Sequence, residues 1–202
     1  MLMEINKEAP EYRKIKHAAE TLKKGGVIVY PTDTIYGLGA DAFNKEAIKK
    51  IYKIKQKDPN TGLSFIVSDL KDISKYAILS DAAFKIIKML TPGPYTFILK
   101  ATKLVPARIM PKRKTIGIRI PNSEISLNIA KMLGNPLIST SINISGEPYF
   151  TNPVEIEKKF GDEIDLILDA GIIADEPSTV IDLTEEVPQI IRQGKGDTSK
   201  IL

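Results

Sequence analysis

Two stretches of the sequence hold more hydrogen-bonding side chains than a strand or a surface loop requires. The apolar run 27–30 stops at Pro31, and Thr32, Asp33 and Thr34 follow it directly. In residues 136–147, PLISTSINISGE, hydroxyl and amide side chains alternate with isoleucines. A core strand would leave those polar atoms unpaired, whereas a surface loop would not need the isoleucines. We therefore expect residues 136–147 to face either a ligand or a buried polar network.

The position of the first stretch also suits ligand binding. Polar side chains that follow the carboxyl end of a strand lie where open α/β sheets bind their ligands. The same threonines and aspartate would suit a tight turn that hydrogen-bonds its own backbone. The residue types at 32–34 do not decide between these two interpretations.

Four cationic residues could bring positive charge to the same region. Lys55 and Lys57 end a predicted helix, where they would complement the helix dipole or reach phosphate groups as movable charges. Arg119 lies inside an apolar strand, so its guanidinium needs an anionic partner, which is either a ligand or a structural ion pair. Arg192 closes the last strand and would face the same opening. These positions favour an anionic ligand, with structural pairing as the alternative.

Several kinds of chemistry are disfavoured by what the sequence lacks. Without cysteine there is no disulfide, no thiolate metal ligand and no cysteine nucleophile. The single histidine, His17, stands on a lysine-rich helix, where we expect it to be solvated rather than catalytic. Neither a Walker loop nor a G-x-G-x-x-G motif is present. No His/Asp/Glu cluster has metal-ligand spacing, so we expect no metal held by the protein itself.

The elements that must position these residues alternate between helix and strand. Apolar side chains recur at helical spacing in 12–24, which should end at Gly25, and in 45–57, for which Asn44 is a suitable N-cap. The last three strands have connections too short for a helical crossover, so part of the sheet should be antiparallel. The expected helices are 12–24, 45–57, 81–90, 123–133 and 153–160, and the expected strands are 27–30, 63–69, 95–101, 115–120, 136–139, 164–170, 178–183 and 188–194.

Length and composition fit one α/β domain. The 202 residues show no repeat, no low-complexity tract and no linker, so we expect residues 1–202 to form a single domain. The expected fold is a twisted mixed sheet of about seven strands flanked by helices. No apolar stretch approaches the roughly 18 residues that span a bilayer, and the charged N-terminus lacks the apolar core of a signal peptide. We expect a cytoplasmic protein with no membrane partner, and its net charge of +4 is compatible with an anionic one.

Taken together, these stretches resemble the YrdC/YciO superfamily of threonylcarbamoyl-AMP synthases. The resemblance covers about Gly25 to Gly196, and the matching pieces follow the order of the family. It implies a twisted α/β sheet with a basic concave face and, because nothing is left over, no additional C-terminal domain. The matching pieces are YPTDTIYGLGADA, the lysine pair after the next helix, TPGPYTFIL, GIRIP, STSINISG, PSTVIDLT and IIRQGKGD.

The resemblance also implies a reaction and the residues that serve it. L-Threonine, bicarbonate and ATP would give threonylcarbamoyl-AMP and pyrophosphate, a step toward the N6-threonylcarbamoyladenosine of certain tRNAs. ATP would carry Mg²⁺ into the site, and catalysis would rest on positioning and charge neutralisation. By the motifs, the residues that would contact threonine are Thr32, Thr34, Tyr36 and Arg119. Lys55 and Lys57 would contact the phosphates and would share the catalytic role with Arg119. The residues that would hold the nucleotide are Ser139, Ser141, Asn143, Ser178 and Arg192.

Two positions depart from the pattern of the synthases. The Lys-x-Arg of the family is here Lys55-Gln56-Lys57, and the histidine that often ends the next strand is here Ser68. Together with TFILK and KRKTIGIRIP, these features resemble the YciO-like branch more closely. The resemblance therefore leaves an alternative, a nucleotide-binding protein that also binds double-stranded RNA or tRNA on its basic face, with little synthase turnover. A hydrolase or carbamoyl-transfer relative that shares the pocket is a third hypothesis.

Overall fold

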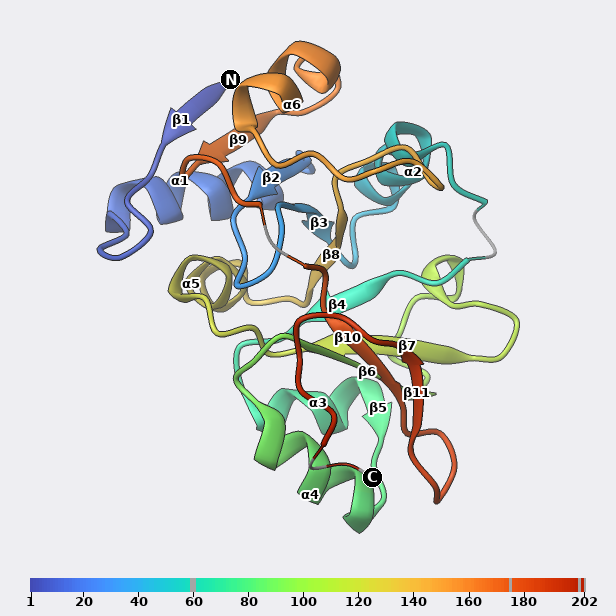
Figure 1. The fold of residues 1–202 in the computed structure, drawn as a ribbon. Helices are drawn as coiled ribbons and strands as arrows, with labels where there is room; N and C mark the ends of the chain where they lie inside the picture. Colours follow the sequence, from blue (N-terminus) through green and yellow to red (C-terminus); the bar gives the residue numbers. More distant parts are fainter. Residues whose placement is uncertain (59–60, 175, 200, 202) are drawn as a thin grey trace.

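One mixed β-sheet runs through the molecule, and helices cover its faces (Figure 1). The computed structural model describes residues 1–58, 61–174, 176–199 and 201. Within them the sheet has eleven strands. In the order of the sheet, these are β1 (Leu2–Glu4), β9 (Leu166–Asp169), β2 (Ile28–Tyr30), β3 (Gly37–Asp41), β8 (Leu137–Ser141), β4 (Ser64–Ile66), β7 (Thr115–Arg119), β6 (Tyr95–Ala101), β10 (Thr179–Asp182) and β11 (Gln189–Arg192), with β5 (Ala77–Ile78) paired to β6 outside that order.

The helices begin and end at residues whose chemistry favours those places. Asn44 accepts hydrogen bonds from the backbone N–H groups of Glu46 and Ala47, at 3.1 and 2.9 Å, which confirms it as the N-cap of α2. Gly25 follows α1 in the left-handed conformation, at φ +84°. No helix in the described part of the chain is long and apolar enough to cross a membrane. The helices are α1 (Tyr12–Lys23), α2 (Lys45–Lys55), α3 (Leu70–Tyr76), α4 (Asp81–Leu90), α5 (Glu124–Leu133) and α6 (Pro153–Phe160), with a 3-10 turn, η1, at Ala107–Ile109.

Alternation along residues 27–30 sends their side chains into two separate cores. Ile28 and Tyr30 belong to the smaller core, to which α1 and α5 contribute. Val27 and Val29 belong to the larger core, which includes buried isoleucines of α2, α4 and α6. All four side chains are fully buried. Burial on both faces fixes the register of β2 in the sheet. The position at which the loop 31–36 begins is therefore also fixed.

The mixed α/β sheet expected from the sequence is confirmed, but the expected number of about seven strands is wrong. The sequence pattern misses three strands and the helix α3. β1 and β5 have three and two residues, too few for alternation to show. β3 has the sequence GLGAD, and its two glycines are more typical of a turn.

The antiparallel pairing expected among the last three strands occurs only between β10 and β11. β9 instead lies parallel to β1 and β2, toward the other end of the sheet. The chain therefore crosses most of the sheet between β9 and β10. This crossing brings Pro177 and Ser178 to the same cavity as the loop 31–36.

Candidate functional site

A cavity of about 370 Å³ lies across the middle of the sheet. Its lining takes residues from seven strands that are consecutive in the sheet, β3, β8, β4, β7, β6, β10 and β11. Strand pairing sets small residues side by side there, since Ser64 lies opposite both Ser139 and Gly117. A Cβ on Gly117 would collide with the hydroxyl of Ser64. The glycine therefore leaves room for a serine hydroxyl in the lining of the cavity.

The loop 31–36 enters the cavity because β2 and β3 form an antiparallel hairpin around it. The two glycines of β3 make room for the ring of Tyr30 on the neighbouring strand. A Cβ on Gly39 would lie 2.6 Å from Tyr30 Cε1, and one on Gly37 would lie 3.1 Å from Tyr30 Cζ. The glycines thus serve strand packing, whereas the polar residues before them serve the loop.

The hydroxyl groups of Thr32 and Thr34 form a chain whose direction can be deduced. Thr32 Oγ1 donates its one proton to the carbonyl oxygen of Ile35 at 2.6 Å and accepts from the Thr34 backbone N–H at 3.1 Å. The 3.0 Å contact between the two hydroxyls therefore uses the proton of Thr34. Thr34 Oγ1 also accepts from Arg119 Nη2 at 3.2 Å. Because its proton is committed, Thr34 can offer a ligand only an acceptor lone pair.

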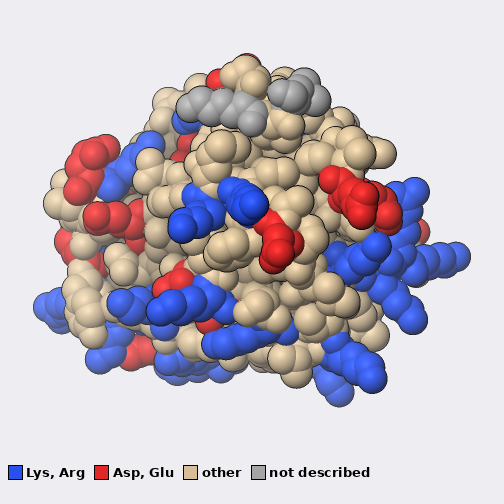
Figure 2. Space-filling view, turned by 90° about the horizontal axis from the view of Figure 1, so that it is seen from below, with Lys and Arg blue, Asp and Glu red and all other residues tan. Residues whose placement is uncertain are grey.

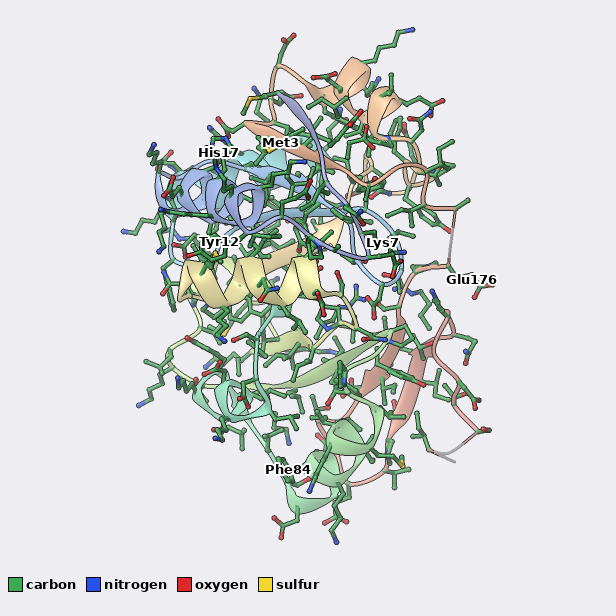
Figure 3. The ribbon with its side chains drawn as sticks, turned by 90° about the vertical axis from the view of Figure 1, so that its left-hand side faces the viewer. Met3, Lys7, Tyr12, His17, Phe84 and Glu176 are labelled. Carbon is green, nitrogen blue, oxygen red and sulfur yellow. The ribbon has the colours of Figure 1, made fainter. Side chains whose placement is uncertain are left out.

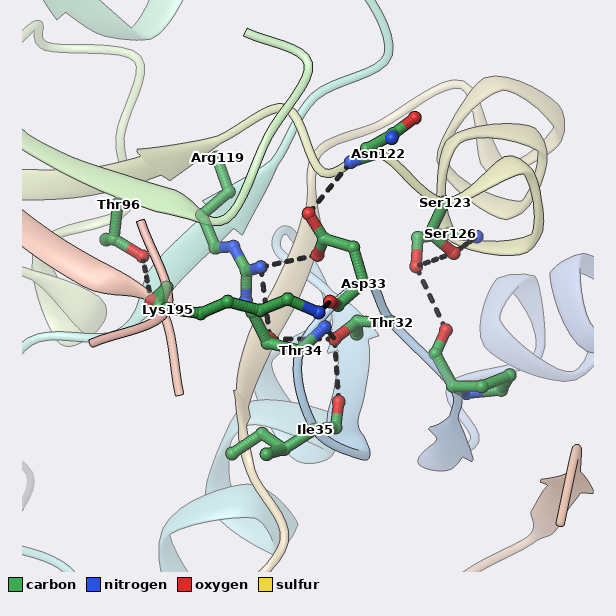
Figure 4. A network of polar contacts seen from close by, with 12 residues as sticks. Thr32, Asp33, Thr34, Ile35, Thr96, Arg119, Asn122, Ser123, Ser126 and Lys195 are labelled. Carbon is green, nitrogen blue, oxygen red and sulfur yellow. Dashed lines mark hydrogen bonds and ion pairs between the residues drawn. The ribbon is translucent and has the colours of Figure 1, made fainter. Parts of the chain in front are cut away.

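Arg119 and Asp33 form a buried ion pair beside this chain (Figure 4). Arg119 Nη2 donates to Asp33 Oδ1 at 2.7 Å, and only 9% and 8% of the two side chains are exposed. The other carboxylate oxygen accepts from the backbone N–H of Asn122 at 2.9 Å. Asp33 is therefore the structural ion-pair partner that was considered for Arg119 from the sequence. Within the described part of the chain, however, both side-chain bonds of Arg119 use Nη2, and Nε is buried without a hydrogen-bond partner, so the guanidinium keeps unused N–H donors for a ligand.

Lys55 lies behind the wall of the cavity rather than in its lining. Its ammonium donates to the carbonyl oxygens of Ser141 and Asn143, at 2.7 and 3.2 Å, and to Asn143 Oδ1 at 2.6 Å. The same amide oxygen accepts from Ser141 Oγ at 2.7 Å, and Asn143 Nδ2 donates to the carbonyl oxygen of Glu147 at 2.7 Å. Burial lowers the pKa of Lys55 to about 8.

Residues 136–147 were expected to face either a ligand or a buried polar network. A buried polar network includes several of them. Lys55 is the centre of that network and is 3% exposed. The geometry gives no support to its predicted contact with phosphate groups. Three oxygen acceptors take the place of the carboxylate partner that a buried lysine usually needs. Lys55 therefore organises the wall that carries Ser141 and Asn143 instead of facing a ligand.

Lys57 is the lysine of the pair that reaches the cavity. α2 ends at Lys55, and Gln56 then turns the chain in the left-handed conformation, at φ 47°. The half-buried Lys57 donates through Nζ to the carbonyl oxygen of Gly62 at 3.0 Å, and burial lowers its pKa. Since an ammonium carries three donors, this bond leaves two of them for a ligand.

The end of the cavity nearest β10 carries Arg192, Ser178 and Thr96. Arg192 donates through Nε and Nη2 to the carbonyl oxygen of Ser178, at 3.3 and 2.7 Å, and the Ser178 and Thr96 hydroxyls are 2.8 Å apart. Burial lowers the pKa of both arginines, and for Arg192 the positive charge of Arg119 adds to the effect. No described residue of the lining is acidic. An anionic ligand would therefore relieve the repulsion between the two arginines.

Tyr36 lines the cavity, but its hydroxyl is already engaged. The hydroxyl donates to the carbonyl oxygen of Gly171 at 2.6 Å and accepts from the backbone N–H of Ala170 at 3.0 Å. Burial raises the pKa of Tyr36 to about 12. These bonds tie the start of β3 to the residues after β9. The structure therefore points to a positioning role for Tyr36 and gives no support to a hydrogen bond from its hydroxyl to threonine.

The predicted site residues, Lys55 excepted, come together around one cavity. Arg119 and Asn143 both line it, as a shared site requires. The motifs did not assign Asp33, Ser64 or Thr96 to the site, although the first holds Arg119 and the other two line the cavity. Ser64 and Thr96 are single polar residues in apolar strands, and only strand pairing reveals their place. The residues that line the cavity as expected are Thr32, Thr34, Tyr36, Lys57, Arg119, Ser139, Ser141, Asn143, Ser178 and Arg192.

Two residues singled out in the sequence lie outside the lining of this cavity. Ser68 lines a separate cavity of about 180 Å³, together with Tyr76 and Asn135. The departure at position 68 is therefore not a change within the candidate site. His17 is half-buried rather than solvated, and Figure 3 shows it on α1. Among the described residues, no group of three or more His, Cys, Asp or Glu side chains is placed to hold a metal ion.

The fold and the cavity define an α/β domain with a candidate site whose described lining holds cations and hydroxyl groups and no carboxylates. Comparison with known sequences identifies the family of this chain. The sequence model of the Sua5/YciO/YrdC family, described as telomere recombination, matches residues 20–194. The chain belongs to this family, so the resemblance inferred from its motifs is confirmed.

Relatives from bacteria and archaea match over nearly the whole chain. An uncharacterized protein of Haemophilus influenzae is 43% identical over 201 residues, which cover 98% of this chain and 97% of the relative. A putative threonylcarbamoyl-AMP synthase of Methanocaldococcus jannaschii is 37% identical over 198 residues, which cover 96% of this chain and 91% of the relative.

Two solved structures extend the comparison to the fold. The crystal structure of Escherichia coli YciO matches with a TM-score of 0.94 and 40% identity, covering 100% of this chain and 99% of YciO. Sua5 of Pyrococcus abyssi, complexed with L-threonine, matches with a TM-score of 0.88 and 31% identity. That match covers 96% of this chain and 57% of Sua5.

Proposed function

We propose that this protein is a nucleotidyltransferase that converts L-threonine, bicarbonate and ATP into threonylcarbamoyl-AMP and pyrophosphate, as a step of tRNA modification. Family membership, the putative synthase of M. jannaschii and the Sua5 structure with L-threonine support this proposal. The observation that carries it is the set of unused N–H donors of Arg119 beside Thr34, in a cavity whose other end holds Arg192 and Ser178.

The Arg119 end of the cavity suits an amino acid with a hydroxyl group. The Arg119 guanidinium offers an unused N–H donor, which a carboxylate oxygen accepts. Thr34 Oγ1 offers an acceptor, which suits a hydroxyl or amine rather than a second carboxylate oxygen. The polar groups of L-threonine complement this pair of one donor and one acceptor.

The remaining residues of the cavity would hold the nucleotide. Lys57 and Arg192 would contact the phosphates, and the hydroxyl and amide groups of Ser139, Ser141, Asn143 and Ser178 would hydrogen-bond the rest of ATP. No carboxylate occurs in the described lining, which fits a Mg²⁺ ion held by phosphate oxygens and brought in with ATP. When bound, this ion would neutralise charge on the leaving pyrophosphate.

The reaction needs orientation more than it needs a protein nucleophile. The amine of threonine adds to the carbon of bicarbonate and water leaves, which gives a carbamate. A carbamate oxygen then attacks the α-phosphorus of ATP, and the bond to the bridging oxygen breaks as pyrophosphate departs. Arg119 would fix the threonine carboxylate so that the carbamate faces the nucleotide, and Lys57 and Arg192 would stabilise charge that develops on the phosphates.

Release of pyrophosphate tests this proposal. The wild-type protein should release pyrophosphate from ATP only when L-threonine and bicarbonate are both present. Arg119→Lys keeps a cationic partner for Asp33 but removes the unused guanidinium donors, so the KM for threonine should rise about tenfold, equivalent to ~1.4 kcal/mol of lost interaction. Release that does not depend on threonine, or an unchanged KM in the variant, would overturn the assignment.

Binding of RNA is the second candidate function, and the distribution of charge favours it. Residues 100–119 contain seven Lys and Arg and no Asp or Glu, whereas the whole chain carries a net charge of only +4. Five of these cations are exposed and form no ion pair within the described part of the chain. Figure 2 shows Lys and Arg side chains gathered toward one edge of the lower face. The five residues are Lys103, Arg108, Lys112, Arg113 and Lys114.

The dependence of binding on salt tests the RNA candidate. If these cations contact phosphates, replacing Lys112, Arg113 and Lys114 by glutamine should reduce the slope of log K against log salt by roughly two to three. A matched triple replacement on α1 and directly after it, at exposed Lys16, Lys23 and Lys24, should leave the slope nearly unchanged. An equal loss in both variants would show attraction by net charge alone and would reject a dedicated RNA surface.

A further inference from the structure

A lysine in the loop after β11 contacts the loop 31–36. Lys195 Nζ donates a hydrogen bond to the backbone carbonyl oxygen of Asp33 at 2.9 Å. Figure 4 shows the extended Lys195 side chain running toward Asp33. Four strands of the sheet, β8, β4, β7 and β6, separate β3 from β10. Lys195 therefore makes a direct link between two ends of the cavity that strand pairing connects only indirectly.

The backbone of Lys195 is fixed to the end of the cavity that carries Ser178. Its N–H donates to the carbonyl oxygen of Pro177 at 3.0 Å. On either side, the Gly194 N–H donates to Thr179 Oγ1 at 3.0 Å, and the same hydroxyl donates to the Gly196 carbonyl oxygen at 2.8 Å. A Cβ on Gly194 would collide with the Pro177 carbonyl group. The loop is thus packed closely at its base, and the lysine side chain extends from a fixed point.

Asp33, at the other end of the link, positions Arg119. Its carboxylate accepts from Arg119 at 2.7 Å and from the backbone N–H of Asn122 at 2.9 Å, while its carbonyl oxygen accepts from Lys195. Because the backbone carbonyl and the carboxylate of Asp33 are separated by only a few bonds, a shift of the carbonyl changes the direction of the carboxylate. The hold of Lys195 on Asp33 therefore bears on the orientation of the Arg119 guanidinium.

We propose that Lys195 is a positioning residue that couples the two ends of the cavity. A nucleotide that orders Ser178 and Arg192 also orders the loop 193–196, and Lys195 then holds Asp33 and Arg119 ready for an amino acid. The inference rests on the proposed function for the identity of the two ligands. Since coupling is reciprocal, the amino acid should tighten nucleotide binding by the same factor.

Hydrogen exchange of the ligand-free protein tests the link without any assumption about the reaction. Lys195→Met should raise the exchange rates of the backbone amides of residues 32–38, because Asp33 loses one of its three anchors. Lys195→Arg, which still donates to a carbonyl oxygen, should keep the wild-type rates. Lys85→Met, on the exposed side of α4, is the matched control. Unchanged exchange at 32–38 in Lys195→Met would overturn the proposal.

Calorimetry with two ligands tests the coupling itself. In the wild type, a non-hydrolysable ATP analogue should increase the affinity for L-threonine, and Lys195→Met should reduce this increase about fivefold while Lys195→Arg preserves it. A loss of analogue affinity with the coupling unchanged would show that Lys195 is only a phosphate ligand and would reject the proposal. If the wild type binds neither ligand, the proposed function fails, and the exchange measurement still decides whether the link exists.

Discussion

One of the three N–H groups of the Lys57 ammonium is held by the Gly62 carbonyl oxygen, and the other two leave the orientation of a bound phosphate loosely defined. A guanidinium at this position could keep the bond to Gly62 and still present two parallel donors to a phosphate. Lys57→Arg should therefore raise threonine-dependent release of pyrophosphate about tenfold, or ~1.4 kcal/mol of transition-state stabilisation. Steady-state rates at a single salt concentration measure the effect.

Lys57→Ala provides the comparison for this prediction. It removes both the charge and the bond to Gly62, so its rate should fall below that of the wild type. If wild type, Lys57→Arg and Lys57→Ala all react at one rate, position 57 is not on the reaction path. The cavity would then hold its phosphates through Arg192 and the hydroxyl groups alone.

The buried ammonium of Lys55 should make stability depend on pH in a defined direction. Burial lowers its pKa from 10.5 to about 8, so between these values the unfolded chain binds more protons than the folded one. The free energy of unfolding should therefore rise with pH across this window, relative to Lys55→Met, which has no group that titrates there. Urea denaturation at pH values near 7.5 and 9.5 measures the difference.

Lys85→Met serves as the control for the pH experiment, because Lys85 is exposed on α4 and takes no part in the buried network around Lys55. Its stability should stay parallel to the wild type over the same pH range. A constant gap between wild type and Lys55→Met across the window would contradict the lowered pKa. It would also weaken the view that Lys55 is sealed behind the cavity wall.

Among the elements, the hairpin of β2 and β3 depends on glycines that accommodate the Tyr30 ring. Gly39→Ala would place a methyl group 2.6 Å from Tyr30 Cε1 and should destabilise the fold by ~1–3 kcal/mol. In a Tyr30→Leu background the same change should cost much less, because the ring is gone. Chemical denaturation of the four proteins forms a double-mutant cycle, and strictly additive effects would contradict the contact.

The sequence predicts an element well where its signal is local. Asn44 and the apolar spacing of 45–57 indicate α2, because a cap and a buried stripe belong to the helix itself. β3 escapes prediction because the reason for Gly37 and Gly39 is Tyr30, a residue of another strand. Ser64 and Thr96 escape for a related reason, since a lone hydroxyl in an apolar strand gains meaning only from its neighbours in the sheet.

At the scale of the whole molecule, the order of the strands decides which charged residues share a space. The motifs predict the residues of the site, and the connection from β9 to β10 brings Ser178 and Arg192 to the cavity that holds Thr34 and Arg119. The motifs do not separate Lys55 from Lys57, although one is sealed behind the wall and the other lines the cavity. That difference arises from the turn at Gln56, which the sequence does not reveal.

The central proposal is that one cavity joins threonine, bicarbonate and ATP. Mass spectrometry of a reaction with carbon-13-labelled bicarbonate tests it most directly, because only carboxylation of the amine followed by adenylation places the label in a threonylcarbamoyl-AMP product. We expect a labelled adduct that requires L-threonine and that falls at least tenfold in Arg119→Lys. Turnover of ATP without a labelled adduct, or an adduct formed equally well by Arg119→Lys, would contradict the assignment.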